Sequence, residues 1–544
     1  MNKLSSGTIK KNKKARNKRQ LLKLSANHET TVFAVTYSLE YAIQQTKEKV
    51  AKISHECREQ NRKFRDREFD LFVNMEDCLY NKKKETFNAT NIKRVTSICK
   101  KPQFFIDGVE PNDIKQGGVG DCWFVASLAV ITNIPKLLET ICVARDEEIG
   151  VYGFIFFKDG DWVSTVVDDQ LFTTGKDDKG NFQLTFAIVG GWTGEGIEDI
   201  TGGVYTLLFT TDILDKDKFW NDILKNVNNN LLLGCARFEF SDKDIKDLKG
   251  TISNHAYSIL RTAETDDGIK LLQMRNPWGK TEWTGAWSDG SKEWTPERMI
   301  KLNHRFGDDG TFWMSYDDFL NYWDMVDMCR LFDSSWMAYI TWINYNVVPR
   351  SKGKFKLSLP EECHLIIVLQ QPDSRYFCDD PKYDYQLSFR VFKEGDDSTY
   401  LVRSRSTFPF ASRSINHEVK LPAGDYIIIP HVTRETIPEP EKKSDENKDE
   451  SKEKVVNIKD IEIEKENWEL QLGLRIYSKC TGIKLEGDPG EFPKKKDKKD
   501  EKAEDKDPEV DTKVIKPKDE EEKDSDKKDE EKDSEKKDDE KKNE

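Results

Sequence analysis

The chain is 544 residues long, which is enough for two or three domains with sizeable hydrophobic cores. Only 36% of its residues are hydrophobic and 34% are charged, and much of this imbalance lies in the terminal segments, so the folded part is smaller than the length suggests. The net charge of −13 argues against nucleic acid as the main partner, because binding to phosphates favours a basic surface.

The cysteines and the apolar runs indicate the compartment. Ten cysteines are scattered without CxxC pairs, a pattern that predicts neither a zinc site nor a dense disulfide framework. The chain has no run of about eighteen apolar residues, and its N-terminus lacks the apolar stretch of a signal peptide. We therefore expect a soluble, cytoplasmic protein in a reducing compartment.

The N-terminal segment divides into a basic arm and a helix. Residues 1–30 begin with a block rich in Lys and Arg and predict a disordered arm, with nuclear import or attraction to anionic lipid as the alternative. Residues 31–60 carry apolar side chains at helical spacing and predict a helical lead-in. The mixed charges that follow predict an exposed continuation of this helix to about Leu71.

A glycine-rich turn and an apolar run come next. In Gln116-Gly-Gly-Val-Gly-Asp-Cys122 the glycines allow turns that other residues resist, and Asp121 stands where a helix N-cap belongs. The apolar run 123–131 then predicts a buried helix with Cys122 in its first turn, where the helix dipole favours the thiolate. The alternative for a cysteine on an apolar helix is a buried structural role. A general base elsewhere in the chain would favour a nucleophilic role for Cys122 over the structural one.

Two stretches rich in β-branched and aromatic residues follow this helix. Residues 151–157 and 162–167, separated by Lys-Asp-Gly-Asp, predict a β-hairpin. Residues 195–203, with glycines at several positions, are interpreted as a second glycine-rich turn.

A β-rich segment supplies a candidate base. Residues 230–236, 255–261 and 269–275 predict three strands; His255 opens the second, and Asn276 follows the third. If these two strands pair antiparallel, both side chains reach the same end of the sheet. A hydrogen-bonded structural histidine is the alternative. The order Cys, His, Asn, with the nucleophile on a helix and the base far downstream on strands, matches a cysteine protease of papain-like plan.

This chemistry gives each residue a role. Cys122 attacks a peptide carbonyl as the thiolate, His255 takes the proton and returns it to the leaving amine, and Asn276 orients the imidazole. Gln116 is predicted to donate a side-chain N–H to the oxyanion together with the backbone N–H of Cys122. Trp278 is expected to shield the His–Asn hydrogen bond from water.

At this point the motifs resemble the protease core of calpains over about residues 61–332. The resemblance rests on Gln116 to Trp123, Asn254-His-Ala-Tyr-Ser258, Arg275-Asn-Pro-Trp-Gly279, Glu282-Trp-Thr-Gly-Ala-Trp-Ser-Asp289 and Asp309-Gly-Thr-Phe-Trp-Met-Ser315. It implies an α+β fold with a papain-like core of two lobes. The cysteine lobe would span residues 61–214, and the His/Asn lobe would span residues 215–335. It also implies cleavage of peptide bonds in protein substrates.

Residues 336–480 resemble the C2-like β-sandwich that follows the core in calpains. Six short stretches predict its strands: residues 355–359, 365–369, 386–391, 417–421, 426–429 and 470–477. A charged loop, 435–466, interrupts the sandwich, and residues 487–544 predict a disordered tail of Lys, Asp and Glu. The sandwich is expected to brace the core, with weak contact to membrane lipid as the alternative.

The resemblance also implies calcium, with departures from the family pattern. In the second lobe the matching ligands are Glu282, Asp289, Asp309 and the carbonyl of Gly307, a set that suits a hard cation. Thr311 stands where the family usually has a further Glu. In the first lobe Gly108 and Asp113 match by position, but residues 181–191 are too short to hold that site's Glu, and solvated loop acids are the alternative. We expect weak binding at the second site.

No loop with the spacing of an EF-hand is present in the sequence, so a penta-EF-hand domain is not expected and a small regulatory subunit is an unlikely partner. Two functions remain in view. The first is an intracellular calpain-like cysteine endopeptidase; the second is a catalytically silent scaffold of the same fold. The presence of Cys122, His255 and Asn276 favours the enzyme. A transglutaminase also uses Cys and His, but its third residue is an Asp.

Overall fold

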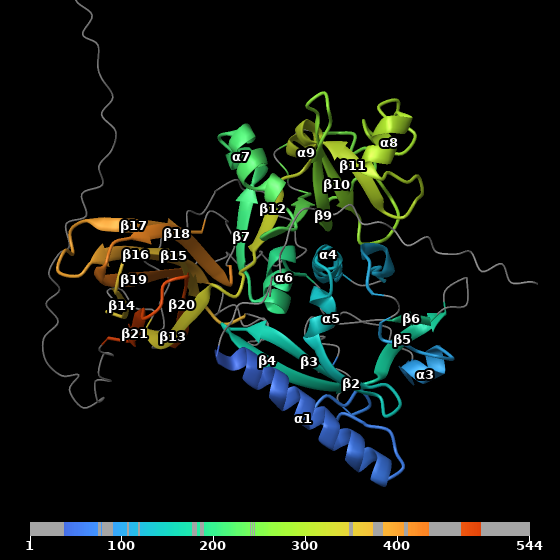
Figure 1. The fold of residues 1–544 in the computed structure, drawn as a ribbon, viewed down its shortest axis with the longest axis horizontal. Helices are drawn as coiled ribbons and strands as arrows, with labels where there is room; N and C mark the ends of the chain where they lie inside the picture. The colour runs from blue at the N-terminus through green and yellow to red at the C-terminus, as the bar shows by residue number, and fades with distance from the viewer. Residues whose placement is uncertain are drawn as a thin grey trace, which may run out of the picture. The chain divides into compact units, whose positions relative to one another are not determined.

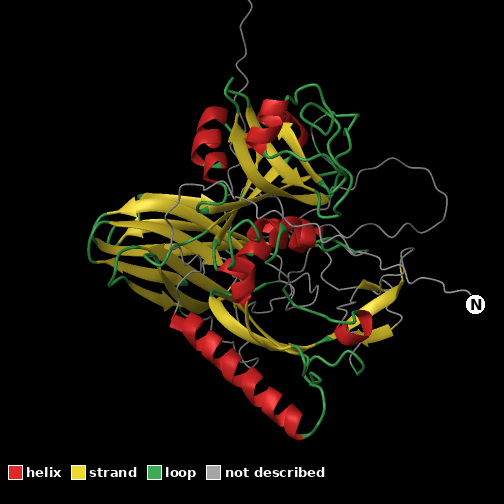
Figure 2. Ribbon diagram, turned by 45° about the vertical axis from the view of Figure 1, so that its right-hand side comes forward, coloured by secondary structure: helices red, strands yellow, loops and turns green. Residues whose placement is uncertain are grey.

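The computed structural model describes residues 37–73, 78, 91–105, 108–117, 120–176, 182–184, 190–239, 241, 243, 245–346, 352–373, 385–406, 412–434 and 469–490. Within these residues five antiparallel sheets are accompanied by short helices and one long helix (Figures 1 and 2). This mixture of helix and antiparallel sheet agrees with the predicted α+β class. The predicted arm 1–30, the charged loop 435–466 and nearly all of the predicted tail lie outside the described residues.

Helix α1 (Tyr37–Glu59) confirms the helical lead-in. Leu39, Ala42 and Val50 recur on one face of the helix and are buried against strands β3 and β4, so an apolar stripe fixes the helix on that sheet. The predicted continuation to Leu71 is wrong. The helix ends at Glu59, and Asn61 adopts a left-handed backbone conformation with φ of +47°, which turns the chain away.

The predicted hairpin is confirmed. Strands β3 (Val151–Lys158) and β4 (Asp161–Asp168) pair antiparallel, and β2 (Cys142–Asp146) completes their sheet. Asp159 and Gly160 at the turn have φ of +52° and +86°, as a tight hairpin turn requires. A second small sheet contains β1 (Asn91–Arg94), β5 (Gln170–Lys176) and β6 (Phe182–Leu184), with the short helix α3 (Val95–Ile98) beside it.

Three helices lie between the sheet of β2, β3 and β4 and the largest sheet (Figure 1): α4 (Cys122–Ile131), α5 (Leu137–Ile141) and α6 (Thr193–Thr201). Helix α4 matches the predicted buried helix. Helix α6 corrects the prediction of a turn at residues 195–203. Its glycines permit close packing instead: a Cβ on Gly194 would lie 1.9 Å from the ring of Tyr205, and one on Gly196 would lie 2.5 Å from Ser127 Oγ.

The largest sheet has six strands in the order β11-β10-β9-β8-β12-β7. Its strands are β7 (Val204–Phe209), β8 (Leu231–Arg237), β9 (His255–Glu264), β10 (Lys270–Arg275), β11 (Thr311–Ser315) and β12 (Met325–Arg330). Its short helices are α7 (Lys216–Asp222), α8 (Pro296–Leu302) and α9 (Tyr316–Tyr322). The three predicted strands appear as β8, β9 and β10. The predicted lobe boundary at residue 214 would put β7 in the cysteine lobe, whereas this strand pairs with β12, which lies in the range expected for the His/Asn lobe.

The described strands between residues 337 and 488 form what we call the two-sheet region, because a four-stranded and a five-stranded antiparallel sheet share one hydrophobic core. The six predicted strands are β14 (Lys354–Leu359), β15 (Cys363–Gln370), β16 (Tyr385–Lys393), β18 (Ser414–Leu421), β19 (Gly424–Arg434) and β20 (Glu469–Ser478). Three further strands were not predicted: β13 (Met337–Asn346), β17 (Tyr400–Arg405) and β21 (Lys484–Asp488). Strand β21 contains Gly487, where the predicted tail began, and pairs with β14.

No helix among the described residues is both long enough and apolar enough to cross a membrane.

Candidate active site

His255 and Asn276 lie together at one end of the six-stranded sheet. His255 is the first residue of β9 and Asn276 follows β10, and these strands pair antiparallel as the prediction required. The His255 Nε2 atom is 2.8 Å from Asn276 Oδ1, and both side chains are buried. An Nε2–H that donates to Asn276 leaves Nδ1 as the basic nitrogen of a neutral imidazole.

Asn276 is held at both ends of its amide. Its Oδ1 also accepts from the backbone N–H of Trp278 at 3.0 Å, and its Nδ2 donates to the carbonyl of Thr281 at 3.0 Å. The Trp278 ring lies 4.7 Å from the His255 ring, and the tryptophan is 36% exposed, so it separates the His–Asn pair from solvent on one side. The imidazole therefore has one fixed orientation.

Cys122 begins helix α4, which packs on β9. Ser258 Oγ donates to the carbonyl of Ala126 at 3.0 Å and ties the strand to the helix. The Cys122 thiol packs against the cluster of Trp123, Ala126 and Ala256, and the backbone N–H of Ala256, the residue that follows His255, lowers the pKa of the thiol. This packing brings the thiol to the strand that carries the imidazole.

The electrostatics of Cys122 differ from the prediction. Burial raises the pKa of the thiol, and this effect outweighs the backbone N–H groups of Ala256 and Trp123, which lower it. The Asp121 side chain forms no hydrogen bond to the helix N-terminus, and its charge also raises the pKa of Cys122. Burial lowers the pKa of His255, while the hydrogen bond to Asn276 raises it in part. The resting pair is therefore a thiol and a neutral imidazole.

Gln116 is anchored to the other side of the site. Its backbone N–H donates to the carbonyl of Pro277 at 2.8 Å, directly after Asn276. Its side chain hydrogen-bonds the Asp121 carboxyl, and this interaction lowers the pKa of Asp121, whereas burial raises it to a greater extent. The side-chain N–H predicted to serve the oxyanion is thus engaged with Asp121 in this structure.

A second set of contacts, which no sequence pattern indicates, joins the loop before Cys122 to the six-stranded sheet. The buried Arg275 donates through its guanidinium to Asn112 Oδ1 at 3.2 Å and to the carbonyl of Ile114 at 2.6 Å. Asn112 Nδ2 donates to Asp309 Oδ2 at 2.9 Å, and Thr311 Oγ1 donates to Asn112 Oδ1 at 3.3 Å. These bonds align the Gln116 loop with the strand end at Asn276.

The predicted second-lobe calcium ligands form hydrogen bonds to nearby backbone. Glu282 accepts from the N–H groups of Asp309 and Gly310 at 2.9 and 2.8 Å, and Asp289 accepts from Gly307 N–H at 2.8 Å. Burial raises the pKa of Glu282 to about 7, and the charges of Asp289 and Asp309 add to this effect. Three carboxyl groups that repel one another suit a hard cation in kind. In the part of the chain that is described, no three His, Cys, Asp or Glu side chains converge closely enough to hold a metal.

The predicted first-lobe ligands fit a cation less well. Asp113 ends the short 3-10 helix η1 (Pro111–Asp113), and its Oδ2 accepts from the backbone N–H of Glu110 at 2.9 Å, so this carboxylate caps a turn. Gly108 has φ of +87°. Most of residues 181–191, where a further ligand was judged missing, lie outside the described residues.

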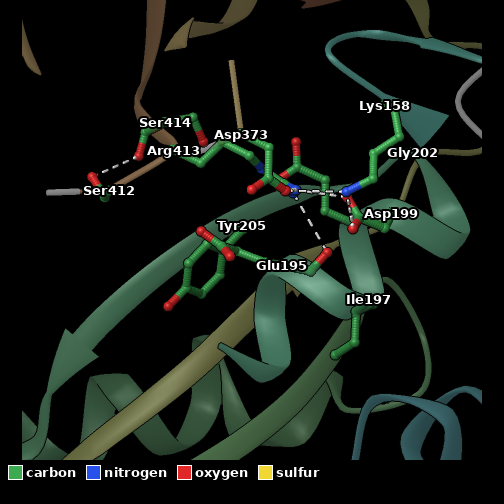
Figure 3. Close-up of polar contacts among 12 residues, drawn as sticks. Lys158, Glu195, Ile197, Asp199, Gly202, Tyr205, Asp373, Ser412, Arg413 and Ser414 are labelled. Atoms are coloured by element: carbon green, nitrogen blue, oxygen red, sulfur yellow. Dashed lines mark hydrogen bonds and ion pairs between the residues drawn. The ribbon is translucent and has the colours of Figure 1, made fainter. Parts of the chain in front are cut away.

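Helix α6 also carries an ionic cluster that the sequence did not reveal (Figure 3). Arg413 lies 2.7 Å from Asp199, and Lys158 bridges Asp199 and Asp373 at 2.6 and 3.2 Å. Arg475 of β20 pairs with Glu198, and both side chains are almost fully buried. The cluster fixes α6, which packs on α4, against the two-sheet region.

A cysteine at a helix start, packed beside a strand that carries a buried His–Asn pair, is the arrangement found in papain-like cysteine proteases. A family model described as "Calpain family cysteine protease" matches residues 64–187 and 180–330. The chain therefore belongs to the calpain family through this protease region.

Individual relatives support this assignment. Calpain-8 of Mus musculus is 35% identical over 282 residues, which cover 44% of this chain and 38% of that protein. The calpain-1 catalytic subunit of Bos taurus is 30% identical over 420 residues, covering 62% and 58%. Calpain-5 of Mus musculus is 26% identical over 444 residues, covering 66% and 69%. The chain spans 38 to 59% of the length of the calpain-8 and calpain-9 relatives that it matches.

Proposed function

We propose that the protein is a cysteine endopeptidase that cleaves peptide bonds in protein substrates. The observation that carries the proposal is the 2.8 Å contact between His255 Nε2 and Asn276 Oδ1, because it leaves Nδ1 as the base on the strand against which Cys122 packs. Calpain-family proteases act on protein substrates, which supports this substrate class.

The first step is proton transfer within the neutral pair. His255 Nδ1 removes the proton from Cys122 Sγ as the sulfur attacks the substrate carbonyl. The thiolate therefore forms during the attack and does not have to be present in the resting protein. The imidazolium then donates its Nδ1 proton to the leaving amine. Water, activated by the same nitrogen, hydrolyses the thioester and releases the thiol.

The oxyanion is stabilised by two donors. The first is the backbone N–H of Cys122 at the start of α4, and the second is the Gln116 side chain after it exchanges the Asp121 carboxyl for the oxyanion. Asn276 acts as a positioning residue, because its two backbone anchors fix the imidazole that it orients.

Calcium is proposed as a modulator. The calpain family is generally calcium-regulated. Glu282, Asp289, Asp309 and the Gly307 carbonyl would hold one ion weakly, since their hydrogen bonds to the backbone must first be exchanged. Gly108 and Asp113 are proposed to contribute little. The ion would supply charge neutralisation among the three carboxylates.

The remaining assignments are proposals of the same kind. We assign the two-sheet region to the C2-like sandwich of calpains, with a bracing role supported by the Arg475–Glu198 pair and with lipid contact as a lesser role. The cysteine usage of the sequence supports a cytoplasmic location, and the net charge supports partners other than nucleic acid.

Casein hydrolysis by the full chain, with and without calcium, tests the proposal. Cys122→Ala should abolish turnover, whereas Cys99→Ala, a change at an exposed free cysteine, should leave it unchanged. An inactive wild type that folds normally and binds casein would favour the scaffold. Full activity of Cys122→Ala would disprove the assigned nucleophile.

A further inference from the structure

A cavity of about 380 Å³ lies where the edges of three sheets meet, on strands other than those that carry His255 and Asn276. Strand β7 is the edge of the six-stranded sheet, β18 is the edge of the four-stranded sheet, and β17 is the edge of the five-stranded sheet. Residues of all three strands line the cavity. The volume is within the range of pockets that bind small molecules.

The charged groups of this cavity are all of one sign. Arg403 and Arg405 are two residues apart on β17 and line the wall together, and none of the described lining residues carries a carboxylate. Arg403 is also directly opposite Arg390 of β16 in the strand register. Like charges directly opposite each other destabilise a sheet. In a chain of net charge −13 this is a local basic site.

The arginines near this cavity differ in their acidic partners. Neighbouring Arg413 is paired with Asp199 and Asp373, whereas within the described residues Arg403 and Arg405 form no ion pair or hydrogen bond. Each guanidinium therefore keeps its N–H donors for a ligand.

A buried hydroxyl is a second, independent observation that points to a ligand. Ser414 of β18 lines the cavity and is only 8% exposed, yet its Oγ has no hydrogen-bond partner among the described residues. The neighbouring hydroxyls are occupied: Ser412 Oγ donates to the carbonyl of Ser414 at 3.2 Å (Figure 3), and Ser404 Oγ donates to the carbonyl of Asn416 at 3.0 Å. A buried hydroxyl without a hydrogen bond costs free energy, so a ligand that accepts a hydrogen bond from it is favoured.

We propose that this cavity, which we call the edge cavity, binds a phosphate-bearing small molecule or headgroup. Two planar guanidinium groups and one hydroxyl supply donors without a competing carboxylate, a combination that recognises phosphoryl oxygens. Trp192, Leu207 and Leu208 line the cavity as well and give a flat or apolar body somewhere to pack. The ligand would bridge the six-stranded sheet and the two-sheet region.

The proposal does not depend on peptidase activity, so the test uses full-length Cys122→Ala protein, in which self-cleavage is removed. Calorimetric titration with pyrophosphate and with adenosine monophosphate should show saturable binding, and either ligand should raise the melting temperature. Arg403→Gln/Arg405→Gln should weaken binding at least about tenfold. The charge-matched control Lys393→Gln/Lys420→Gln, at exposed residues outside the cavity, should change it less than twofold.

Ser414→Ala gives a second readout. Because the hydroxyl has no hydrogen-bond partner in the described part of the chain, its loss should weaken binding several-fold without lowering the melting temperature of the ligand-free protein. Two results would overturn the proposal. One is unchanged ligand affinity in Ser414→Ala, and the other is a loss of affinity in Lys393→Gln/Lys420→Gln equal to that in Arg403→Gln/Arg405→Gln.

Vesicle binding distinguishes a lipid headgroup from a free phosphate-bearing ligand. Phosphatidylcholine vesicles with and without phosphatidylinositol phosphate are compared with the soluble probes. Binding only to the phosphorylated vesicles, lost in Arg403→Gln/Arg405→Gln, supports a lipid headgroup; binding to the soluble probes supports a free ligand. Binding to neither overturns the proposal.

Discussion

The protonation states of two side chains, Cys122 and His255, decide how the site can react. Burial raises the pKa of the Cys122 thiol and lowers that of the His255 imidazole, and the hydrogen bond to Asn276 Oδ1 leaves Nδ1 as the basic nitrogen. A protein that generates its thiolate only during attack differs from one that stores a thiolate–imidazolium pair. The distinction lies in the surroundings of Cys122, where burial raises the pKa of the thiol most and the Asp121 charge adds to this effect.

Asn276→Ala should lower kcat/KM about tenfold to a hundredfold, because the imidazole loses its fixed orientation while nucleophile and base remain. The hydrogen bond that His255 donates to Asn276 raises the pKa of His255, so its removal should lower that pKa further. Since the base works in its neutral form, the acid limb of the pH profile should move to lower pH. Steady-state kinetics across pH measures both effects.

The matched control for this change is Asn221→Ala on the exposed face of α7, which should leave activity and pH profile unchanged. An acid limb that stays in place in Asn276→Ala, despite lost activity, would contradict the positioning role.

At the scale of elements, strands were predictable where their apolar residues run without interruption. Residues 255–261 and 269–275 gave β9 and β10 because buried strands of this sheet are apolar on both faces. Helix α6 was missed because the glycines at 196, 202 and 203 suggest a turn, whereas Gly196 is needed for close contact with Ser127 inside the helix. The bonds of Asn112 could not be predicted, since they join residues almost two hundred positions apart.

The ionic cluster on α6 leads to a prediction about stability. Arg475→Leu should lower the free energy of unfolding by about 3 kcal/mol, because it leaves the buried Glu198 with one partner fewer. Burial raises the pKa of Glu198, but Arg475 and Arg413 outweigh this effect, so its folded pKa lies below 4.5. The stabilisation is therefore present above that pH and is lost as the pH falls through the folded value.

Urea unfolding at pH 7 and at about pH 4 checks this prediction. Arg330→Leu, which removes the more exposed pair with Glu418, serves as control and should cost about 1 kcal/mol or less. A cost for Arg475→Leu that is no larger than the control, or that grows in acid, would show that the cluster does not stabilise the fold.

At the scale of the whole molecule, the described chain divides into a protease region and a two-sheet region, which are joined through α6. The two-sheet region extends beyond the predicted boundaries because β21 pairs with β14 after a sharp turn that carries no strong strand signal. The edge strand β17 was missed for a similar reason, since alternate arginines make it look like a surface loop.

Truncation tests where the folded chain ends. Deletion of residues 492–544 should leave melting temperature and turnover nearly unchanged, because this segment has few apolar residues to bury. Deletion from residue 484 removes β21 and should lower the melting temperature by several degrees, because it exposes the edge of β14. Equal melting temperatures for the two truncations in calorimetry would contradict the role of β21.

Asp309, one of the proposed calcium ligands, accepts a hydrogen bond from Asn112 Nδ2, so the proposed calcium site is linked to the loop before Cys122. Calorimetric titration of the full chain should show about one weak site, and Glu282→Gln/Asp309→Asn should remove it. Asp266→Asn/Asp267→Asn, at exposed acids in a distant turn, should leave it unchanged. Two tight sites, or calcium binding that survives the Glu282 and Asp309 changes, would refute the assigned ligands.

The central claim is that Cys122 Sγ forms a covalent bond with the substrate carbonyl, and the most direct measurement is to trap that bond. The full chain is mixed with a peptide ester, quenched in acid and analysed by peptide mass mapping. We predict an acyl group on Cys122 in the wild type, its absence in Cys122→Ala, and slow formation in His255→Ala. An acyl group on another residue, or ester turnover by Cys122→Ala at the wild-type rate, would contradict the account.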